Sequence, residues 1–518
     1  MLLKSILNIK NQYLNKLAIK TASESLTYEE LIEKSCNISQ NLKEYVDEFN
    51  LKSKSPCCGL IFNHGVSGIV AIVACVLSGL TYVPLDSSYP ENRLIYMADN
   101  SNIKFLITDY EGVNLTKELA GKMKSEPQII VLEELDYNAS KEYTLPIEMS
   151  NNPDVYILYT SGSTGKPKAV IQKAESIVHF ASEYISNLNI TKEDKLTLFS
   201  TYGHDAAVID IFSSLLSGAC LYPLDLREPK NFFTLHNWLK ENEITVWHSV
   251  PSLFRMFWNA YNKVVNLPYL RLVVLGGEAV REHDFILCNE KLNKVKLYNL
   301  YGQTESSYSA GNYITEKDDV AFIGIPVKDT HLIVVSKHGV VKKIPDTCFE
   351  KKYICSELSK YDVNEGELLI CSRFIANGYW KNEEVTKNAF INSPIFGKLY
   401  RTGDYVTLCE DGKIIFSGRK DTQIKIRGHR VEIGEIESTI LRIKDIVECA
   451  VISENIADQT KLIAFVKSNN KYDTADINNV LKKYLPTYMM IFKVVMIDTF
   501  PLTVTGKIDR NKLICLTN

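Results

Sequence analysis

Short apolar runs rich in β-branched residues alternate with longer mixed segments along most of this chain, and no other feature constrains the fold as much. Runs of this kind lie at residues 129–132, 155–159, 196–199, 245–248, 272–275 and 295–298. Short, continuous apolar runs suit strands that are buried on both faces of an α/β sheet. Several end directly on glycine or polar residues, at 160–165, 276–278 and 299–305. Loops beyond the carboxyl ends of such strands are where α/β sheets bind ligands, so we expect the site there.

The chain of 518 residues is too long for one hydrophobic core, so more than one domain is expected. After about residue 366 the pattern changes to short strands with turn signals, such as the Glu-Asp-Gly of 410–412. From about residue 420 the chain is more charged. We therefore predict an α/β protein with an N-terminal core over 1–420, made of α/β sheets plus a β-rich segment. A small α+β domain follows over 421–518.

One apolar stretch, residues 68–83, could be mistaken for a membrane span. It is short for a span, and Gly79 and Pro84 interrupt it near its end. A buried helix that leads into a strand is the favoured interpretation. No membrane partner is expected.

Composition excludes several classes of function. Lys and Arg total 59 against 62 Asp and Glu, a net charge of -3, which gives no reason to expect nucleic acid or an anionic membrane as partner. The 12 cysteines show no CxxC spacing, so a structural zinc site is not expected. Residues 1–20 have no signal-peptide core, and together with the cysteine pattern this favours a reduced, cytoplasmic setting.

A glycine- and hydroxyl-rich loop follows the run at 155–159 and includes Thr160, Ser161, Gly162, Ser163, Thr164, Gly165 and Lys166. Glycines let the backbone approach a phosphate closely, while N–H groups, hydroxyls and a lysine supply donors and charge. The spacing is not that of a Walker A loop, because only two residues separate the two glycines. Taken alone, the segment fits a phosphate loop and a flexible surface turn equally well.

The loop resembles the signature of the adenylate-forming superfamily, which comprises acyl-CoA synthetases, nonribosomal peptide synthetase adenylation domains and luciferases. Other segments that resemble that family occur in the family's order, at 26–31, 77–86, 299–305, 366–380, 400–404, 418–430, 485–489 and 501–510. About ten such segments in order cover essentially the whole chain. The chain is most similar to a freestanding amino-acid adenylation domain.

The resemblance implies ATP and Mg²⁺ as reactants and assigns roles to individual residues. Lys507 would bridge the substrate carboxylate and the α-phosphate, Thr304 would contact the α-phosphate, and Glu305 would bind Mg²⁺. Asp421 would be the hinge about which a mobile C-terminal domain turns between adenylation and thiol transfer. The nucleotide-binding set implied beside the loop is Gly277, Glu278, Ala279, Asn299, Tyr301, Gly302, Asp404 and Arg419. Within this set, Tyr301 would stack on adenine, and Asp404 would hold the ribose hydroxyls with help from Arg419.

Asp205 stands where amino-acid activators carry the aspartate that pairs with the substrate's α-ammonium group. Its alternative role is that of a helix cap. His204 complicates the assignment, because aryl- and acyl-activating relatives often have His there. The implied pocket is His204, Asp205, Ala206, Ile209, His248, Val273, Leu275, Leu300, Tyr308 and Ser309. This mostly apolar set, with two or three polar tips, suits a small or medium side chain, and His248 fits a substrate contact or a core histidine equally well.

The chain departs from the family pattern at a few positions, such as Gln303 in place of the usual Pro. It ends soon after Arg510, so the expected acceptor is the phosphopantetheine thiol of a separate carrier protein. Three alternatives remain open. They are an acyl- or aryl-CoA ligase that uses free CoA, a D-alanine–carrier protein ligase, and a nucleotide-binding relative that has lost catalysis.

Overall fold

The computed structural model describes residues 2–48, 56–135, 153–162, 166–261, 266–292, 294–316, 320–336, 341–343, 365–409, 412–419, 423–456, 459–502 and 508–516. The chain forms two compact units. The first comprises Met1–Asp86, Ala98–Leu158 and Ala169–Lys420, and the second comprises Ser87–Met97, Tyr159–Lys168 and Asp421–Asn518. This is the mixed α/β architecture, with a large N-terminal part and a smaller C-terminal part, that the sequence predicts.

A nine-stranded sheet lies in the first unit, with strand order β15-β14-β13-β12-β11-β9-β10-β1-β2. Its bounds are β1 Leu17–Lys20, β2 Ser25–Thr27, β9 Lys195–Leu198, β10 Cys220–Pro223, β11 Val246–Ser249, β12 Leu272–Gly276, β13 Lys296–Gln303, β14 Ser307–Ile314 and β15 Ile325–Pro326. Strands β9 to β13 run parallel, and β11 and β12 are buried along their whole length. The continuous apolar runs therefore form strands that are covered on both faces, as predicted.

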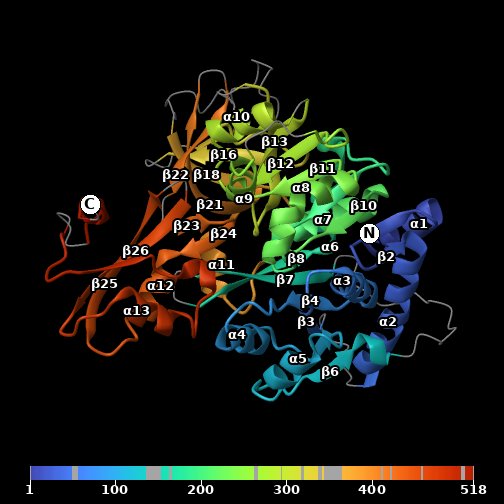
Figure 1. Cartoon of the computed structure of the whole chain (residues 1–518), viewed down its shortest axis with the longest axis horizontal. Helices are drawn as coiled ribbons and strands as arrows, with labels where there is room; N and C mark the ends of the chain where they lie inside the picture. The colour runs from blue at the N-terminus through green and yellow to red at the C-terminus, as the bar shows by residue number, and fades with distance from the viewer. Residues whose placement is uncertain are drawn as a thin grey trace. The chain divides into compact units, whose positions relative to one another are not determined.

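Helices cover both faces of this sheet (Figure 1). Their bounds are α1 Leu2–Tyr13, α2 Tyr28–Glu48, α6 Ala174–Leu188, α7 Asp205–Ser217, α8 Pro229–Glu241, α9 Pro251–Asn259 and α10 Glu282–Lys291. Residues of α6 and α7 share one hydrophobic cluster with Val246 and Val274, while residues of α9 share another with Trp247 and Val273. Alternate residues of each strand thus enter different cores.

A second, seven-stranded sheet has the order β19-β8-β7-β4-β3-β5-β6. Its bounds are β3 Cys57–Ile61, β4 Thr81–Pro84, β5 Phe105–Thr108, β6 Gln128–Val131, β7 Asp154–Thr160, β8 Lys168–Lys173 and β19 Gly378–Tyr379, with helices α3 Val66–Ser78, α4 Glu91–Ser101 and α5 Val113–Ala120 and the 3-10 turn η1 Leu132–Glu134 nearby. The apolar stretch at 68–83 forms α3 and β4, and Gly79 ends α3 in the left-handed conformation (φ 76°). This confirms the buried helix that leads into a strand. Among the described residues, no helix is long and apolar enough to cross a membrane.

The β-rich segment forms a third, antiparallel sheet that belongs to the first unit. Its strands are β16 His331–Val335, β17 Val341–Lys343, β18 Glu365–Cys371, β20 Phe390–Ser393, β21 Gly397–Leu408 and β22 Ile414–Arg419, with helix α11 Glu383–Ala389. Strand β21 pairs with β18, β20 and β22. Asp404 of β21 pairs with Arg419 of β22, and this pairing fixes the backbone position of that carboxylate.

The C-terminal part of the second unit contains a hairpin and a three-stranded sheet. The elements are β23 Gln423–Ile426, β24 His429–Glu432, α12 Ile433–Ile440, β25 Ile446–Ile456, β26 Gln459–Ser468, α13 Thr474–Leu481, η3 Thr487–Met489, β27 Lys493–Met496 and α14 Arg510–Ile514. Arg427 and Gly428 both have positive φ (50° and 78°), as a two-residue hairpin turn requires. Ile436, Val451 and Leu481 lie in one core cluster.

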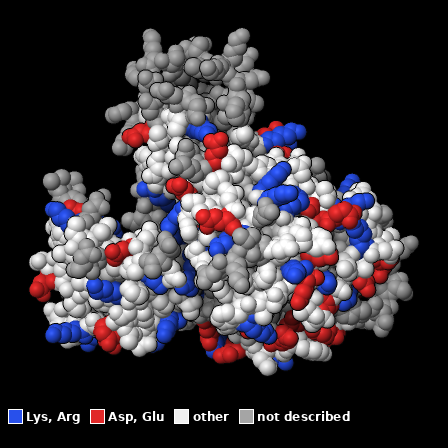
Figure 2. Space-filling model, turned by 45° about the horizontal axis from the view of Figure 1, so that its top comes forward, with Lys and Arg blue, Asp and Glu red and all other residues white. Residues whose placement is uncertain are grey.

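Lys and Arg are interspersed with Asp and Glu on the face of the described residues that Figure 2 shows. This mixture agrees with the nearly balanced composition of 59 basic and 62 acidic residues.

Candidate active site

Asp205 opens helix α7 at the carboxyl end of the nine-stranded sheet. Its Oδ1 accepts the N–H of Ala206 at 3.0 Å, and this is its one hydrogen bond or ion pair within the described part of the chain. A carboxylate in the first turn is favourable beside the helix N-terminus. The half-buried side chain therefore keeps one oxygen available for a cation.

His248 lies on β11, opposite Asp210 of α7. Its Nδ1 is 2.6 Å from Oδ1 of Asp210, and the two side chains are 5% and 1% exposed. Burial lowers the pKa of His248, but the charge and hydrogen bond of Asp210, with a further contribution from Asp205, outweigh burial and raise this pKa above its ordinary value. The carboxylates of Asp205 and Asp210 therefore both act on the charge of His248.

The predicted wall of the pocket is displaced by one position along β12. Val274 pairs with His248 across β12 and β11, and Gly276 pairs with Leu300, so these four residues face the same side of the parallel sheet. Val274 and Leu300 share the hydrophobic cluster that contains Ile209.

The predictions of Val273 and Leu275 as pocket residues were wrong in register. Both side chains pack with Trp247 in the cluster on the opposite face of the sheet. The strand period of two separates Val273 and Leu275 from Val274 and Gly276, but it does not tell which pair borders the pocket.

The two other polar residues of the predicted pocket have partners within the protein. The hydroxyl of Tyr308 lies 2.5 Å from that of Tyr298 and accepts the Asn187 amide at 3.1 Å. The hydroxyl of Ser309 donates to the Ser306 carbonyl at 3.2 Å. Neither hydroxyl is therefore the first choice for contact with a substrate.

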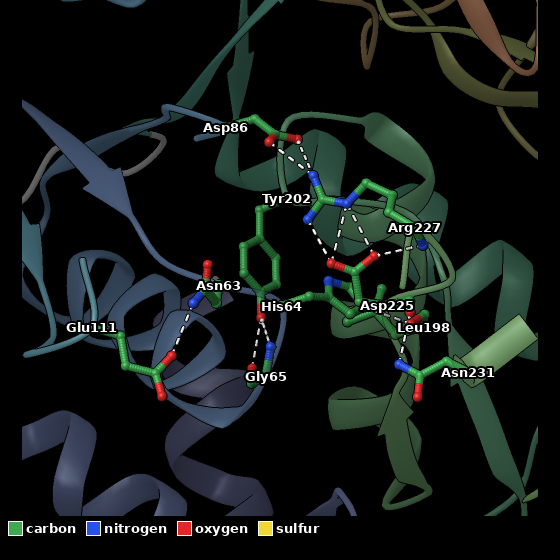
Figure 3. Close-up of polar contacts among 10 residues, drawn as sticks. All are labelled: Asn63, His64, Gly65, Asp86, Glu111, Leu198, Tyr202, Asp225, Arg227 and Asn231. Carbon is green, nitrogen blue, oxygen red and sulfur yellow. Dashed lines mark hydrogen bonds and ion pairs between the residues drawn. The ribbon is translucent and has the colours of Figure 1, made fainter. Parts of the chain in front are cut away.

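His204 precedes α7, beside a cluster of charged residues. Burial lowers its pKa, against the effect of the Asp205 and Asp86 carboxylates. Arg227 donates to Asp86 at 2.9 Å and to Asp225 at 2.7 Å, and Figure 3 shows the guanidinium between the two carboxylates. Because Asp86 follows β4 and Asp225 follows β10, this cation ties the carboxyl ends of the two large sheets together beside His204.

An aromatic bracket lies next to this cluster (Figure 3). His64 Nε2 is 2.7 Å from the Leu198 carbonyl, and the His64 ring stacks on Tyr202 with centroids 5.4 Å apart. The Tyr202 hydroxyl donates to the Gly65 carbonyl at 2.6 Å. The bracket fixes the strand end and the loop that lead to His204.

Asp404, the predicted ribose ligand, has a dense set of hydrogen bonds. Its Oδ2 accepts from the Tyr301 hydroxyl at 2.6 Å and from Gln303 Nε2 at 2.8 Å, while Oδ1 forms an ion pair with Arg419. The structure thus brings together three of the predicted nucleotide residues. Burial and the charge of Asp404 raise the pKa of Tyr301, which keeps its hydroxyl a donor.

Gln303, which replaces the proline usual in the family, is part of this network and was not recognised as such from the sequence. It donates to the Thr402 carbonyl at 3.1 Å, and its own carbonyl accepts from the Tyr400 hydroxyl at 2.6 Å. The motif pattern identified Gln303 only as a departure, with no signal for its partners.

Glu305, the predicted Mg²⁺ ligand, is completely buried. Its Oε1 accepts the Tyr379 hydroxyl at 2.6 Å. Carboxylate oxygens are what Mg²⁺ prefers, with phosphate oxygens and water completing its shell. Within the described ranges, no group of three or more His, Cys, Asp or Glu side chains could hold a metal ion by itself. The single carboxylate therefore fits a metal that arrives with a nucleotide.

Three predicted adenosine residues directly follow β12, and the fourth, Asn299, lies within β13. Glu278 accepts from the Ser252 N–H at 2.9 Å at the start of α9, and the amide of Asn299 donates to the Phe322 carbonyl at 2.8 Å. Gly277 has a positive φ of 79°, and Ala279 is exposed. Gly277 and Ala279 thus offer backbone to a ligand, while the side chains of Glu278 and Asn299 have protein partners.

The predicted phosphate loop belongs to the second unit. Its Ser161 hydroxyl donates to the Arg430 carbonyl at 2.7 Å, and the N–H of Gly162 donates to Glu435 at 3.3 Å. A Cβ on Gly162 would collide with the Lys166 carbonyl, so this turn requires glycine. Ser163, Thr164, Gly165, Lys507 and Asp421 lie outside the described residues.

Two sequence profiles match the chain. One, described as "AMP-binding enzyme", matches residues 8–380, and the other, "AMP-binding enzyme C-terminal domain", matches residues 435–507. The chain is 30% identical over 506 residues to tyrocidine synthase 1 of Brevibacillus parabrevis, covering 96% of the chain and 43% of that protein. It is 28% identical to zwittermicin A synthase ZmaJ of Bacillus cereus, over 97% and 92% of the two chains. The chain thus spans less than half the length of tyrocidine synthase 1.

Solved structures share the fold at low identity. The Vibrio cholerae adenylation domain AlmE, bound to glycyl-adenosine-5′-phosphate, has a TM-score of 0.82 at 21% identity, over 100% of this chain and 98% of that one. The o-succinylbenzoate CoA synthetase MenE of Bacillus subtilis has a TM-score of 0.81 at 19% identity, over 98% of each chain. A fused adenylation–PCP di-domain from Klebsiella oxytoca has a TM-score of 0.78 at 23% identity, over 95% and 93% of the two chains.

Proposed function

Because the chain belongs to the AMP-binding enzyme family of adenylate-forming ligases, we propose that it activates a small amino acid with ATP and passes the aminoacyl group to a carrier-bound thiol. In the first step a carboxylate oxygen bonds to the α-phosphorus of ATP, and the bond from that phosphorus to pyrophosphate breaks. In the second step a phosphopantetheine thiolate bonds to the acyl carbon, and AMP leaves with the electron pair of the broken C–O bond.

Asp205 is the observation that carries the choice of an amino acid. Its carboxylate is half-buried at the pocket and keeps one oxygen without a hydrogen-bond partner among the described residues. A cation at about 4 Å would gain roughly 4 kcal/mol of Coulomb energy at an effective dielectric constant of 20. The α-ammonium of an amino acid supplies that cation, whereas an acid without an amine leaves the carboxylate unpaired.

The substrate carboxylate and the ATP phosphates are both anions, so the protein must offset their repulsion and hold the nucleotide. Asp404, held by Tyr301, Gln303 and Arg419, would bind the ribose hydroxyls. Bound Mg²⁺ would neutralise phosphate charge, and Glu305 would hold it. Lys507 would stabilise the charge that develops at the α-phosphate, as groups placed for a transition state do. The donors of the phosphate loop would orient the pyrophosphate that leaves.

A separate carrier protein is the acceptor that we favour. Relatives among peptide synthases and the likeness to an adenylation–PCP di-domain support this choice. The second candidate is a CoA ligase, which His204 and the likeness to MenE favour. A D-alanine–carrier ligase is a variant of the first proposal that differs in stereochemistry, and a non-catalytic relative is the remaining alternative.

Mass spectrometry of the products distinguishes these acceptors. The full chain is incubated with ATP, Mg²⁺ and its best amino acid, and with either free CoA or a phosphopantetheinylated carrier. We expect an aminoacyl thioester on the carrier and release of AMP, with little CoA thioester. Rapid turnover of free CoA, without loading of any carrier, would favour the CoA ligase instead.

A further inference from the structure

His248, a residue of the predicted substrate pocket, belongs to a buried ion pair that none of the proposed reaction steps uses. Asp210 lies five residues after Asp205 on α7, and its Oδ1 is 2.6 Å from Nδ1 of His248 on β11. Both side chains are almost fully buried, at 1% and 5% exposure. A buried carboxylate is costly unless it is paired, so Asp210 depends on this imidazole.

The second carboxylate oxygen of Asp210 has no partner that could replace His248. Oδ2 is buried and has no hydrogen-bond partner among the described residues, so His248 is the one group that satisfies the carboxylate there. Whether the pair is charged or neutral, Nδ1 of the ring is directed at Asp210. The orientation of the ring is therefore fixed.

The second ring nitrogen of His248 points away from Asp210. Nε2 has no hydrogen-bond partner within the part of the chain that the structure describes. The ring lies on the side of the sheet that Val274, Gly276 and Leu300 share, in the electrostatic field of Asp205. The free nitrogen therefore lies on the pocket side, where Asp205 would hold the amino group.

Other polar groups of the pocket wall are already used. The hydroxyls of Tyr308 and Ser309 have protein partners, and Val274 and Ile209 are apolar. Among the described wall residues that β11, β13 and β14 contribute, this leaves Nε2 of His248, which is a donor when the imidazole is protonated or when the proton shared with Asp210 lies on the carboxyl group. A buried donor that faces an apolar ligand loses its hydrogen bond with water and gains nothing in exchange.

The charges around His248 also restrict which substrate side chains can bind there. Asp210 already neutralises an imidazolium at His248, so no surplus positive charge remains for a substrate side-chain carboxylate, and Asp205 adds a negative charge nearby. A protonated imidazole offers no acceptor for a side-chain ammonium group. An uncharged side-chain oxygen needs no positive charge from the protein, and it accepts the hydrogen bond that a protonated imidazole donates.

We infer that the activated amino acid has an uncharged side chain whose oxygen, of a hydroxyl or an amide, accepts a hydrogen bond from His248 Nε2, and that Asp210 is the positioning residue for this contact. The inference rests on the proposed activation of an amino acid and specifies its side chain. Asp210 touches the imidazole and not the substrate.

ATP–pyrophosphate exchange by the full chain, with matched amino acids, tests the inference. The pairs are threonine and valine, asparagine and leucine, and glutamine and methionine, with aspartate and glutamate as charged members. We expect the oxygen-bearing member of the pair that fits best to have the higher kcat/KM by roughly 10- to 100-fold. Equal or better exchange with the apolar member would overturn the inference.

Variants separate the contact from a general effect on folding. His248→Leu should lower kcat/KM for the oxygen-bearing member more than for the apolar member and so remove the preference, and the same variant with Asp210→Leu, which leaves no buried carboxylate unpaired, should show the same ratio. A matched control is His283→Gln on α10, whose ring is exposed and bonds Asn259, and this variant should keep the preference. A preference that survives in His248→Leu would overturn the inference.

Asp210→Asn tests positioning by its effect on the pH profile. The titratable groups that face His248 are Asp205 and Asp210 on α7 and Tyr184 on α6, and burial raises the pKa of Tyr184, which keeps it neutral. In the parent protein, KM for the oxygen-bearing substrate should rise as pH increases through the raised pKa of His248. The Asn variant still accepts from Nδ1 but lacks the charge, so this rise should move to lower pH.

An unchanged KM profile in Asp210→Asn would show that Asp210 has only a structural role and would overturn its assignment. If the proposed function itself were wrong, the exchange assay would give a different result, because no amino acid of any class would support ATP–pyrophosphate exchange. That result would remove the inference together with the proposal on which it rests.

Discussion

The Tyr301 hydroxyl donates a hydrogen bond of 2.6 Å to Oδ2 of Asp404, and Arg419 holds the other oxygen of the same carboxylate. The Tyr301 ring was expected to stack on adenine. The Tyr301 hydroxyl has a separate role, because its hydrogen bond orients the Asp404 carboxylate that would bind ribose. One residue thus links the two halves of the proposed nucleoside site.

Tyr301→Phe separates the two roles of this residue. The variant keeps the ring and removes one hydrogen bond to a charged group, which is worth about 1.5–3 kcal/mol. We expect KM for ATP to rise roughly 10-fold in the exchange assay while KM for the amino acid stays unchanged. Equal changes in both constants would point to a general disturbance of the site.

Lys507→Ala should nearly abolish adenylate formation and leave ATP binding largely intact. A cation that acts only in the transition state contributes on the order of 10²–10³ in kcat. Exchange rates measure the loss, and nucleotide binding by calorimetry measures what remains. Lys512→Ala, with an exposed lysine on α14, is the control, and an active Lys507 variant would contradict the assigned role.

Asp205→Ala should impair exchange with amino acids more than exchange with their des-amino analogues. The variant removes the carboxylate that would pair with the α-ammonium, so only substrates with an amine lose an interaction. The ratio of the two kcat/KM values is the readout. Equal loss with both substrates would show that Asp205 acts as a helix-start residue and not as a ligand.

Asp421→Pro tests the hinge. Proline fixes φ near −65° and so restricts rotation at this residue. Because the proposed rotation falls between the two half-reactions, we expect thioester formation to slow several-fold more than pyrophosphate exchange. A parallel loss of both reactions would remove the support for a hinge at this position.

Asp284→Ala tests the electrostatics of the fold at a buried ion pair in the first unit. Arg255 and Asp284 are 2.6 Å apart, with side-chain exposures of 6% and 0%. Removing Asp284 leaves the buried Arg255 charge with only its longer contact to Glu278 at 3.8 Å, and loss of one partner of a buried pair costs about 3–5 kcal/mol. We expect the free energy of unfolding in urea to fall by that amount.

The control for this experiment is an exposed ion pair. Glu118 lies 3.0 Å from Lys122 at the surface, and Glu118→Ala should change the free energy of unfolding by less than about 1 kcal/mol. If both variants lost the same free energy of unfolding, burial of the Arg255–Asp284 pair would not explain its effect on stability.

Hydrophobic pattern predicted much of the fold. The runs at 129–132, 155–159, 196–199, 245–248 and 272–275 form strands within one residue of their predicted ends, because strands covered on both faces must be apolar throughout. The run at 295–298 forms a strand that extends to Gln303, past its apolar part. Pairing with β14 holds these last polar residues in the sheet.

The site was harder to predict than the fold. Comparison of motifs identified Asp404 and Glu305, whose surroundings are determined by long-range partners such as Tyr379 that no local pattern reveals. It placed Val273 where Val274 belongs, because a fully apolar strand gives no internal sign of which alternate residues face the pocket. Asp210 was missed because it lies on helix α7, and its partner, His248, lies far along the sequence on strand β11.

The central claim is that this chain forms an adenylate with an amino acid. ATP–pyrophosphate exchange, screened over amino acids and over the same acids without the amine, tests it most directly. We expect exchange with at least one amino acid and far slower exchange with its des-amino analogue. Exchange with aryl or fatty acids alone, or with no acid at all, would contradict it.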